Sequence, residues 1–403
     1  MLENLLIGYH YNVDDPDSII ISLGLELKRW FASFTRAPLA LASWLQKIRT
    51  KGRTTMTYLT LGIDIGKHSF SCCLLHTDRS IAQQRTFTRA ELFKFLDALA
   101  AETTKEGQLV PVAMEACGSS SWLAEEIETR GFPVKLIHAR YVKPYLTARQ
   151  KNDERDAHAI AKASLDPELH PVAIKRADQR AVTNLHKVRE RLVGTRTALV
   201  NQMRSMLWEE GLTPRQGRKW FEWYIKAYLD DHREALHPTT FALLQSLILE
   251  LRDIGSQIEG IETEIEGCLA DMPVARALMT IPGIGLMNAT ALAAHVGDAK
   301  RFKSGRDMAA WLGLVPRQST TGGRQMLGRI TKAGNGYLRK LLVHGARSLL
   351  AFTRATDHPM VQWAQGLRAR GMGINQAATA LANKLARLCW AIMAKGTSYR
   401  AKG

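Results

Sequence analysis

The sequence predicts an α/β unit near the N-terminus followed by a mostly all-α remainder. Short apolar runs typical of strands gather in the first unit, and two of them end at an acidic residue. Two long stretches with apolar residues at helical spacing, Val182–Leu207 and Phe241–Ala270, come next. The predicted parts are an N-terminal extension at 1–55, an α/β unit at 56–165, a helical coiled-coil linker or dimerisation arm at 166–270 and a small α-helical C-terminal unit at 271–403.

Residues 1–55 differ in pattern from the rest, and Met56 stands just before the first clear strand. An upstream start codon or a loosely attached extension explains this segment, and no chemistry is assigned to it. The α/β unit then opens with three consecutive strands. Thr88 precedes a helix with Glu91 at its third position, which is a capping-box pattern. The expected elements are strands at Tyr58–Ile65, Ser69–His76, Ile81–Phe87, Leu109–Met114 and Pro133–Ile137, and a helix at Ser119–Arg130 closed by Gly131.

Three strands in a row, followed by alternating helices and strands, are the order of a ribonuclease H-like domain, although a fold alone does not give a function. The two long amphipathic stretches have no core of their own, so they predict an antiparallel coiled coil or a dimer arm. Trp220, Trp223 and Tyr224 lie between them. They either pack a helix corner or stack on bases.

The C-terminal unit begins with a short helix and Ile-Pro-Gly-Ile-Gly at 281–285. Its predicted helices run through His295, Met308–Leu312, Tyr337–Ala351 and Asn375–Ala394, with a Gly-rich loop at 318–323. Ile-Pro-Gly-Ile-Gly before an Ala-rich helix resembles half of a helix-hairpin-helix. Backbone N–H groups at Gly283 and Gly285 would then hold a DNA phosphate, and a plain helix corner is the alternative.

The charge balance is strongly basic, with 55 Lys and Arg against 38 Asp and Glu and a formal net charge of +17. Such an excess indicates a nucleic-acid partner or, less often, an anionic membrane surface. The sequence has no apolar run long enough to cross a bilayer and no signal-peptide pattern. Its five cysteines lack zinc-site spacing and indicate reduced core thiols. These features predict a cytoplasmic protein.

Four acids are the main candidates for chemistry. Asp64 and Glu115 end two predicted strands, and Asp153 and Asp156 share one face of a predicted helix. Carboxylate oxygens suit Mg²⁺ or Mn²⁺, and two such ions about 4 Å apart can assist phosphodiester cleavage. Gly62 and Gly66 flank Asp64 and would let another backbone or a phosphate come close. Glu154 points outward in this interpretation, and Lys67 and His158 either touch phosphate or are solvated.

The 318–323 loop supplies three adjacent hydroxyls, on Ser319, Thr320 and Thr321. A hydroxyl nucleophile needs activation by a base or a metal. Gly322 and Gly323 would let backbone approach a scissile phosphate. Basic side chains nearby could neutralise that phosphate. They are Arg317, Arg324, Arg329, Lys332 and Arg339.

Several motifs together resemble the DEDD transposases of the group of insertion sequences 110 and 1111. Gly-Ile-Asp-Ile-Gly-Lys, Met-Glu-Ala-Cys-Gly-Ser and Lys-Asn-Asp-Glu-Arg-Asp-Ala resemble their N-terminal domain. Ile-Pro-Gly-Ile-Gly, the Gly-Gly loop and Gly-Arg-Ile-Thr-Lys-Ala-Gly-Asn-Gly-Tyr-Leu-Arg resemble their C-terminal domain. The resemblance runs from about Met56 to near the C-terminus and leaves out residues 1–55, which favours Met56 as the natural start.

The resemblance implies a RuvC-like fold carrying the four DEDD acids, which map onto Asp64, Glu115, Asp153 and Asp156. It also implies a C-terminal serine that attacks DNA and forms a covalent intermediate in a composite site shared between subunits. The family places that serine just before the loop glycine, where this chain has Thr320 and Thr321. Ser319 lies further back, so the nucleophile is Ser319 or a threonine, or this copy is impaired.

The predicted function is therefore that of a Mg²⁺-dependent (or Mn²⁺-dependent) transposase that recombines DNA. From the resemblance alone, its partners are the element ends and target DNA, a structured guide RNA and further copies in a dimer or tetramer, without a membrane, on the nucleoid of a prokaryotic cell. Two alternatives stay open: a RuvC-type junction-resolving nuclease that uses water, and a non-catalytic nucleic-acid-binding protein.

Overall fold

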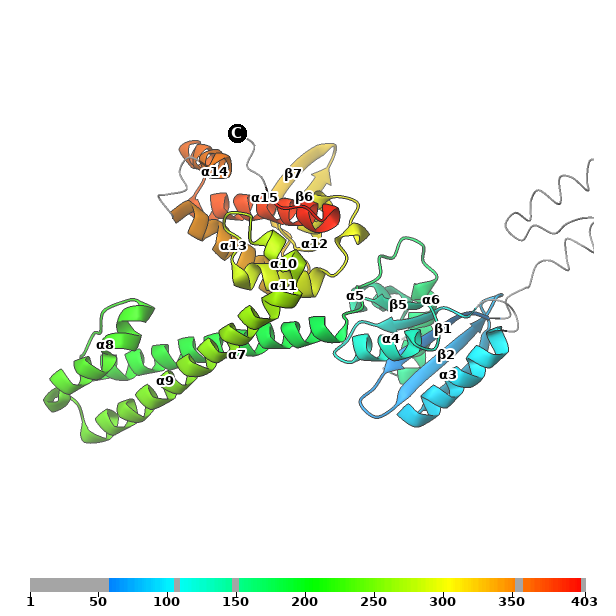
Figure 1. Cartoon of the computed structure of the whole chain (residues 1–403), viewed down its shortest axis with the longest axis horizontal. Helices are drawn as coiled ribbons and strands as arrows, with labels where there is room; N and C mark the ends of the chain where they lie inside the picture. Colours follow the sequence, from blue (N-terminus) through cyan, green and yellow to red (C-terminus); the bar gives the residue numbers. More distant parts are fainter. Residues whose placement is uncertain (1–57, 105–108, 147–151, 352–357, 400–403) are drawn as a thin grey trace, which may run out of the picture.

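The protein has an α/β unit, a long helical arm and a helical C-terminal unit, arranged as Figure 1 shows. The computed structural model describes residues 58–104, 109–146, 152–351 and 358–399, so the predicted extension at 1–55 lies outside the described residues. One helix, α7, starts at the α/β unit, passes the C-terminal unit and reaches toward the far end of the arm (Figure 1). The three parts contain separate groups of buried apolar side chains.

The α/β unit is built on a five-stranded sheet with the order β3-β2-β1-β4-β5. The first three strands form an antiparallel meander, and β4 and β5 continue it in parallel with β1. The five predicted strands are confirmed, with small shifts at their ends. Their bounds are β1 Tyr58–Ile65, β2 Phe70–His76, β3 Ile81–Phe87, β4 Val112–Glu115 and β5 Val134–Ile137.

Helices cover both faces of this sheet, which explains why its central strands are apolar runs without alternation. Helices α3 and α4 pack on one face, where Cys72 and Leu74 of β2 are buried. Helix α6 packs on the other face, where Cys73 and Leu75 are buried against Ala157. The helices are α3 Arg89–Thr104, α4 Ser120–Glu128, α5 Ala139–Val142 and α6 Asp153–Ser164.

The predicted capping box at the start of α3 is present. The Thr88 backbone N–H donates to the Glu91 carboxylate at 2.8 Å, and the Glu91 N–H donates to the Thr88 hydroxyl at 3.5 Å. Gly131, just beyond α4, has a φ of +87°, a conformation that favours glycine after a helix. The start of α3 and the end of α4 are therefore recognisable from the local sequence.

The arm consists of α7 Ala177–Glu209 and α9 Pro238–Gly267, with α8 Arg218–Asp231 near its tip (Figure 1). Apolar residues of the three helices share one core, as their spacing predicts. The aromatic residues of α8 divide between two environments. Trp220 packs against this core, whereas Trp223 and Tyr224 are exposed.

The C-terminal unit is mostly helical, but it also contains a two-stranded sheet where the sequence predicted a loop. Gly322 and Gly323 both have positive φ and connect β6 to β7 by a two-residue turn. The prediction of an all-α unit was therefore incomplete. The elements are α10 Pro273–Leu278, α11 Leu286–Val296, α12 Gly305–Trp311, β6 Pro316–Thr321, β7 Arg324–Ile330, α13 Gly336–Ala351, α14 Pro359–Ala369 and α15 Ile374–Lys395.

Short 3₁₀ turns join several helices, at η2 Lys143–Tyr145, η3 Arg233–Ala235, η4 Cys268–Asp271 and η5 Ala299–Arg301.

The chain also returns to the sheet before α7 begins. Val172 forms an antiparallel bridge with Leu136 of β5, and its N–H donates to the Leu136 carbonyl at 2.7 Å. Within the described ranges, each helix is too short or too polar to span a bilayer.

Candidate metal centre and hydroxyl-bearing hairpin

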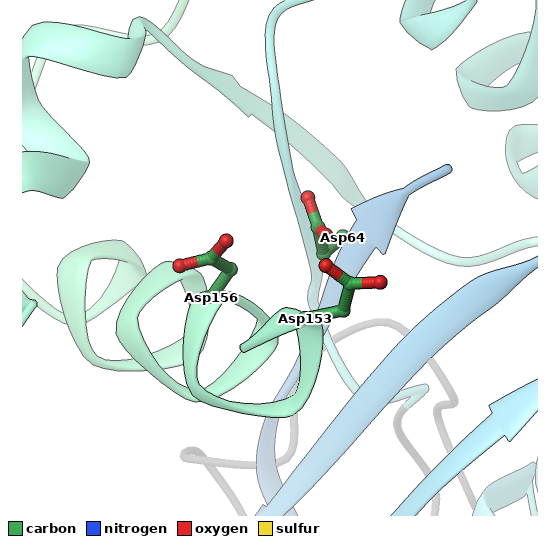
Figure 2. Close-up of side chains that lie close together, drawn as sticks. All are labelled: Asp64, Asp153 and Asp156. Carbon is green, nitrogen blue, oxygen red and sulfur yellow. The ribbon is translucent and has the colours of Figure 1, made fainter. Parts of the chain in front are cut away.

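Three of the four predicted acids meet at the carboxyl end of β1. Asp64, Asp153 and Asp156 each offer a carboxylate oxygen, and these oxygens lie within 4.8 Å of one another. Figure 2 shows Asp64 on the strand and the two other side chains on the first turn of α6. The structure therefore brings the acid at the end of β1 together with the two acids that are three residues apart on α6.

Local sequence explains why α6 starts at this point. The Asn152 side chain accepts a hydrogen bond from the Glu154 backbone N–H at 3.0 Å and so caps the helix. Negative side chains in a first turn are favoured by the free N–H groups there. Glu154 is exposed, in line with the prediction that it points outward.

Glu115 lies on the neighbouring strand, outside that group of three. The β1–β4 register pairs Ile63 with Met114, so the next residue of each parallel strand is an acid. Its carboxyl contributes to the repulsion that acts on Asp64. The fourth predicted acid thus borders the cluster on the β4 side.

The cluster carries negative charge that nearby cations offset only in part. Burial and then repulsion from Asp156, Asp153 and Glu115 raise the pKa of Asp64 to about 6. Burial and Asp156 also raise the pKa of Glu115, against the opposite effect of His138 and Lys143. In the part of the chain that the structure describes, none of the four acids forms an ion pair. Oxygen ligands crowded in this way fit a divalent cation.

Two further basic residues border the cluster without having been predicted. His138 directly follows β5, whose Ile137 is in register with Glu115. The His138 ring accepts a hydrogen bond from the Arg140 N–H at 3.1 Å, and this caps α5. Lys143 lies one turn later, in η2. The expected strand at 133–137, parallel to that of Glu115, was the signal that could have placed His138 at this edge.

The predicted phosphate contacts near the acids have different surroundings. Lys67 is exposed in the turn between β1 and β2. His158 is half-buried on α6, and burial, followed by the charge of Lys162, lowers its pKa. Lys67 is therefore free to reach an anion at the edge of the cluster.

The candidate hydroxyls lie on an exposed hairpin in the C-terminal unit. Ser319, Thr320 and Thr321 are consecutive residues of β6, and all are exposed. Because side chains alternate along a strand, Ser319 and Thr321 share one face and Thr320 lies on the other. In Figure 1 the hairpin and the acid-bearing end of α6 belong to separate units and lie apart. The structure thus does not bring the two predicted groups together within one chain.

The predicted basic residues surround this hairpin, but one of them has another role. Arg317, Arg324, Arg329 and Lys332 are exposed. The Arg339 guanidinium instead donates to the carbonyl oxygens of Leu312 at 2.9 Å and Ala333 at 2.8 Å. These two carbonyls belong to the chain segments that enter and leave the hairpin.

The same two segments cross closely enough to require glycine. A Cβ atom on Gly334 would overlap the carbonyl oxygen of Trp311, and Gly334 has a φ of +67°. Arg339 and Gly334 therefore fix the base of the hairpin. The guanidinium uses part of its donor capacity for this purpose, which leaves less of it for nucleic acid.

Gly283 and Gly285 border a groove of about 910 Å³ between α9, α11 and α13. Gly283 packs closely against Gly345 of α13. A Cβ atom on Gly345 would overlap the Gly283 carbonyl oxygen. The opposite wall of the groove carries Glu259 and Glu266. Phosphate binding at these glycines remains a prediction, and the acidic wall counts against it.

Two family models match this chain, and together they span both candidate regions. Residues 61–210 match a family of DEDD transposases of the IS110 type, described as Transposase, and residues 275–360 match the family described as Transposase IS116/IS110/IS902 family. The first match contains all four acids, and the second contains the hairpin.

Three relatives align with most of this chain and with most of their own length. A probable family 20 transposase of Pseudomonas aeruginosa is 38% identical over 86% of this chain and 99% of its own. The transposase for insertion sequence element IS1328 of Yersinia enterocolitica is 36% identical over 84% and 98%. The transposase for insertion sequence element IS1111A of Coxiella burnetii is 35% identical over 84% and 91%. The chain belongs to the IS110 family of insertion-sequence transposases.

Proposed function

We propose that this transposase cleaves and rejoins DNA at a divalent-metal centre formed by Asp64, Asp153, Asp156 and Glu115. The observation that carries the proposal is the group of three carboxylates with oxygens within 4.8 Å of one another. A RuvC-like, ribonuclease H-like fold is consistent with the sheet order and with the family. Bound Mg²⁺ or Mn²⁺ would stabilise negative charge on the reacting phosphate.

The chain's own residues would bind and orient the DNA. Lys67 is exposed beside the acids, and Arg317, Arg324, Arg329 and Lys332 are exposed around the hairpin. Such contacts go mainly to phosphates and carry no sequence information. Because they release counterions, DNA affinity should fall steeply between low and moderate salt.

A hydroxyl of the hairpin would act as the nucleophile. Its oxygen would form a bond to phosphorus while the bond from phosphorus to one deoxyribose oxygen breaks, and its proton would pass to a base. The freed sugar oxygen takes up a proton and leaves as a hydroxyl. Attack by the hydroxyl of another strand would reverse these steps, so strands are exchanged without net hydrolysis.

The position of the hairpin bears on how such a site would be completed. Because the acids and the hydroxyls lie apart within one chain, a second copy would supply one of the two groups (Figure 1). The same separation favours the alternative of a RuvC-type nuclease, since attack by water needs no hairpin. A dimer or tetramer, and pairing of an element-encoded RNA with the DNA, are supported by family membership.

Trapping a covalent protein–DNA adduct tests the proposal. The protein would be incubated with an element-end DNA and Mg²⁺ and then denatured. We expect the parent to form an adduct, and we expect one of Ser319→Ala, Thr320→Ala and Thr321→Ala to abolish it. Cleavage without an adduct in all four proteins would favour the hydrolytic alternative. If Asp64→Ala leaves strand exchange unchanged, the metal-centre proposal is wrong.

A further inference from the structure

Helix α7 joins the acid-bearing unit to the C-terminal unit through two junctions of different chemistry. The first junction is ionic and lies at the start of the helix, against α4. The second is a buried network of neutral groups that begins six residues beyond Arg180, which is about 9 Å of helix. The contrast between them determines which parts of the protein can move against each other.

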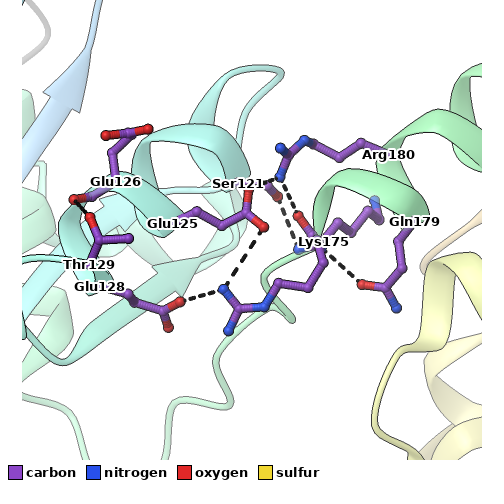
Figure 3. A network of polar contacts seen from close by, with 9 residues as sticks. Ser121, Glu125, Glu126, Glu128, Thr129, Lys175, Gln179 and Arg180 are labelled. Atoms are coloured by element: carbon purple, nitrogen blue, oxygen red, sulfur yellow. Dashed lines mark hydrogen bonds and ion pairs between the residues drawn. The ribbon is translucent and has the colours of Figure 1, made fainter.

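The ionic junction is drawn in Figure 3. Arg176 pairs with Glu128 at 2.7 Å, and Arg180 pairs with Glu125. The Arg180 guanidinium also donates to the Lys175 carbonyl at 2.7 Å. These side chains remain 22% to 57% exposed, so water and salt reach them. Ion pairs of this exposure are weak and are screened by salt.

The segment just before this junction is fixed to the α/β unit. Val172 bridges to β5, and Val172 and Ile174 pack on the core of that unit. The Lys175 N–H donates to the Ser121 hydroxyl of α4 at 3.3 Å. The backbone between Ile174 and Ala177 is therefore the short connection at which the unit could turn relative to α7.

The second junction centres on His186, which is fully buried. Thr290 of α11 donates its hydroxyl proton to the Leu286 carbonyl at 2.7 Å, so its oxygen accepts from His186 Nε2–H at 3.0 Å. His186 Nδ1 then accepts from the Tyr337 hydroxyl of α13 at 2.9 Å. This one tautomer satisfies every polar atom of the network.

One flanking pair reinforces the second junction. Glu190 of α7 pairs with Lys340 of α13, whereas Arg189 donates to Glu262 of α9 at 2.7 Å and so holds α7 within the arm. Both side-chain hydrogen bonds of the buried His186 reach the C-terminal unit, so a loosening of this junction that breaks them while the ring stays out of water is strongly unfavourable. Helix α7 is thus held to the C-terminal unit much more firmly than to the α/β unit.

We propose that the Arg176 and Arg180 ion pairs with Glu128 and Glu125 form a releasable latch, and that on its release the acid-bearing unit turns about residues 175–176 while α7 and the C-terminal unit move as one body. Arg176 and Arg180 are then positioning residues that set where the acids lie relative to the hairpin. The relevance for strand exchange rests on the proposed function, but the motion itself does not.

Distance measurements between spin labels test the latch directly. Genetically encoded label sites avoid the exposed Cys117, and all chosen positions are exposed. The pair Lys94 and Gln365 reports the α/β unit against the C-terminal unit. The pair Glu250 and Gln365 reports the arm against the C-terminal unit. Both pairs would be measured in the full chain without DNA, at low salt and at about 1 M KCl, where screening is nearly complete.

We expect the first pair to broaden or shift at high salt and in Glu125→Arg/Glu128→Arg, while the second pair stays narrow. Adding Arg176→Glu/Arg180→Glu restores opposite charges and should restore the low-salt distribution. Asp97→Arg, which breaks a similarly exposed ion pair with Arg130 inside the α/β unit, is the matched control and should change neither pair.

An unchanged first pair in the charge-reversed variant and at high salt overturns the proposal. Equal broadening of both pairs overturns it too, because the second junction would then not be rigid. The salt measurement uses the parent sequence, so the test does not depend on any variant's folding. If the parent protein shows the expected spin-label distances but forms no covalent adduct with DNA, the result would instead count against the proposed function.

Discussion

Gly62 of β1 lies against the backbone of Ala157 in α6. A Cβ atom on Gly62 would overlap the Ala157 carbonyl oxygen and lie 2.6 Å from the Ala161 amide nitrogen. This absence of a side chain lets the helix lie on the strand two residues before Asp64. The meeting of Asp64 with Asp153 and Asp156 therefore depends on a residue that carries no functional group.

Gly62→Ala should accordingly destabilise the protein and weaken the metal centre. Backbone atoms must shift to accept the methyl group, and overpacking of this kind costs about 1–3 kcal/mol. Chemical denaturation measures the loss. Gly255→Ala is the control, because that helical site has open space and gains helix propensity. Equal stability of Gly62→Ala and the parent would contradict the close packing.

Asp64→Asn should abolish stabilisation by Mg²⁺ or Mn²⁺. The parent's melting temperature should rise with metal concentration, because an ion that binds only the folded state stabilises it. Glu154→Gln is the control, because Glu154 is an exposed acid in the first turn of α6 that lies outside the group of three carboxylates. This variant should keep the full response to metal. A metal response in Asp64→Asn equal to that of the parent would remove Asp64 from the centre.

Without metal, the same Asp64→Asn variant should be more stable than the parent at pH 8. The folded pKa of Asp64, about 6, lies above its ordinary value of 3.8. The parent therefore loses stability as pH rises from about 4 to 6, and remains less stable above that range. Allowing for partial exposure of the group, we expect a gain on the order of 1 kcal/mol. Denaturant unfolding at pH 4 and pH 8 tests the sign.

Metal affinity should depend on pH in the same window. Below about pH 6, Asp64 must release a proton before it can bind a cation. We expect the dissociation constant for Mn²⁺ to rise up to about tenfold for each pH unit below 6 and to level off above 7. Titration calorimetry from pH 5 to 8 measures it. A constant affinity over that range would show that Asp64 is not a ligand.

Arg339→Gln should loosen the hairpin without reducing the number of DNA contacts. Its guanidinium holds the Leu312 and Ala333 carbonyls at the hairpin base, and glutamine cannot donate to both in the same geometry. We expect faster amide hydrogen exchange in β6 and β7 and less covalent adduct. The salt dependence of DNA binding should stay that of the parent, whereas Arg324→Gln should reduce it. The opposite pattern would make Arg339 a phosphate ligand.

The strands and the acids were predictable because local sequence determines both. A run such as that of β2 is apolar almost throughout because both faces are covered, and Asp64 is the next-to-last residue of β1, where such a run ends. The hairpin was missed although Thr-Thr-Gly-Gly-Arg is a recognisable two-residue turn signal. Its polar, exposed strands bury no apolar face, so they lack the alternation that marks most strands.

Other features depend on contacts between distant segments and leave no local pattern. From the sequence, Arg339 is indistinguishable from a surface cation. Its hydrogen bonds to the Leu312 and Ala333 carbonyls are visible only in the folded structure. His186 is an isolated histidine on an amphipathic helix, and its partners lie 104 and 151 residues away. The buried position lowers its pKa to about 4, which only the folded surroundings could indicate.

The bridge from Val172 to Leu136 has a consequence for assembly. It pairs one residue of β5, which forms one border of the sheet, and so interrupts the row of backbone groups that this border would otherwise offer to another strand. The other border, β3, is left with alternating polar and charged residues such as Gln83 and Arg85. For this five-stranded sheet, a strand donated by another molecule would therefore find its longer uninterrupted border at β3, two strands away from β1 and its Asp64.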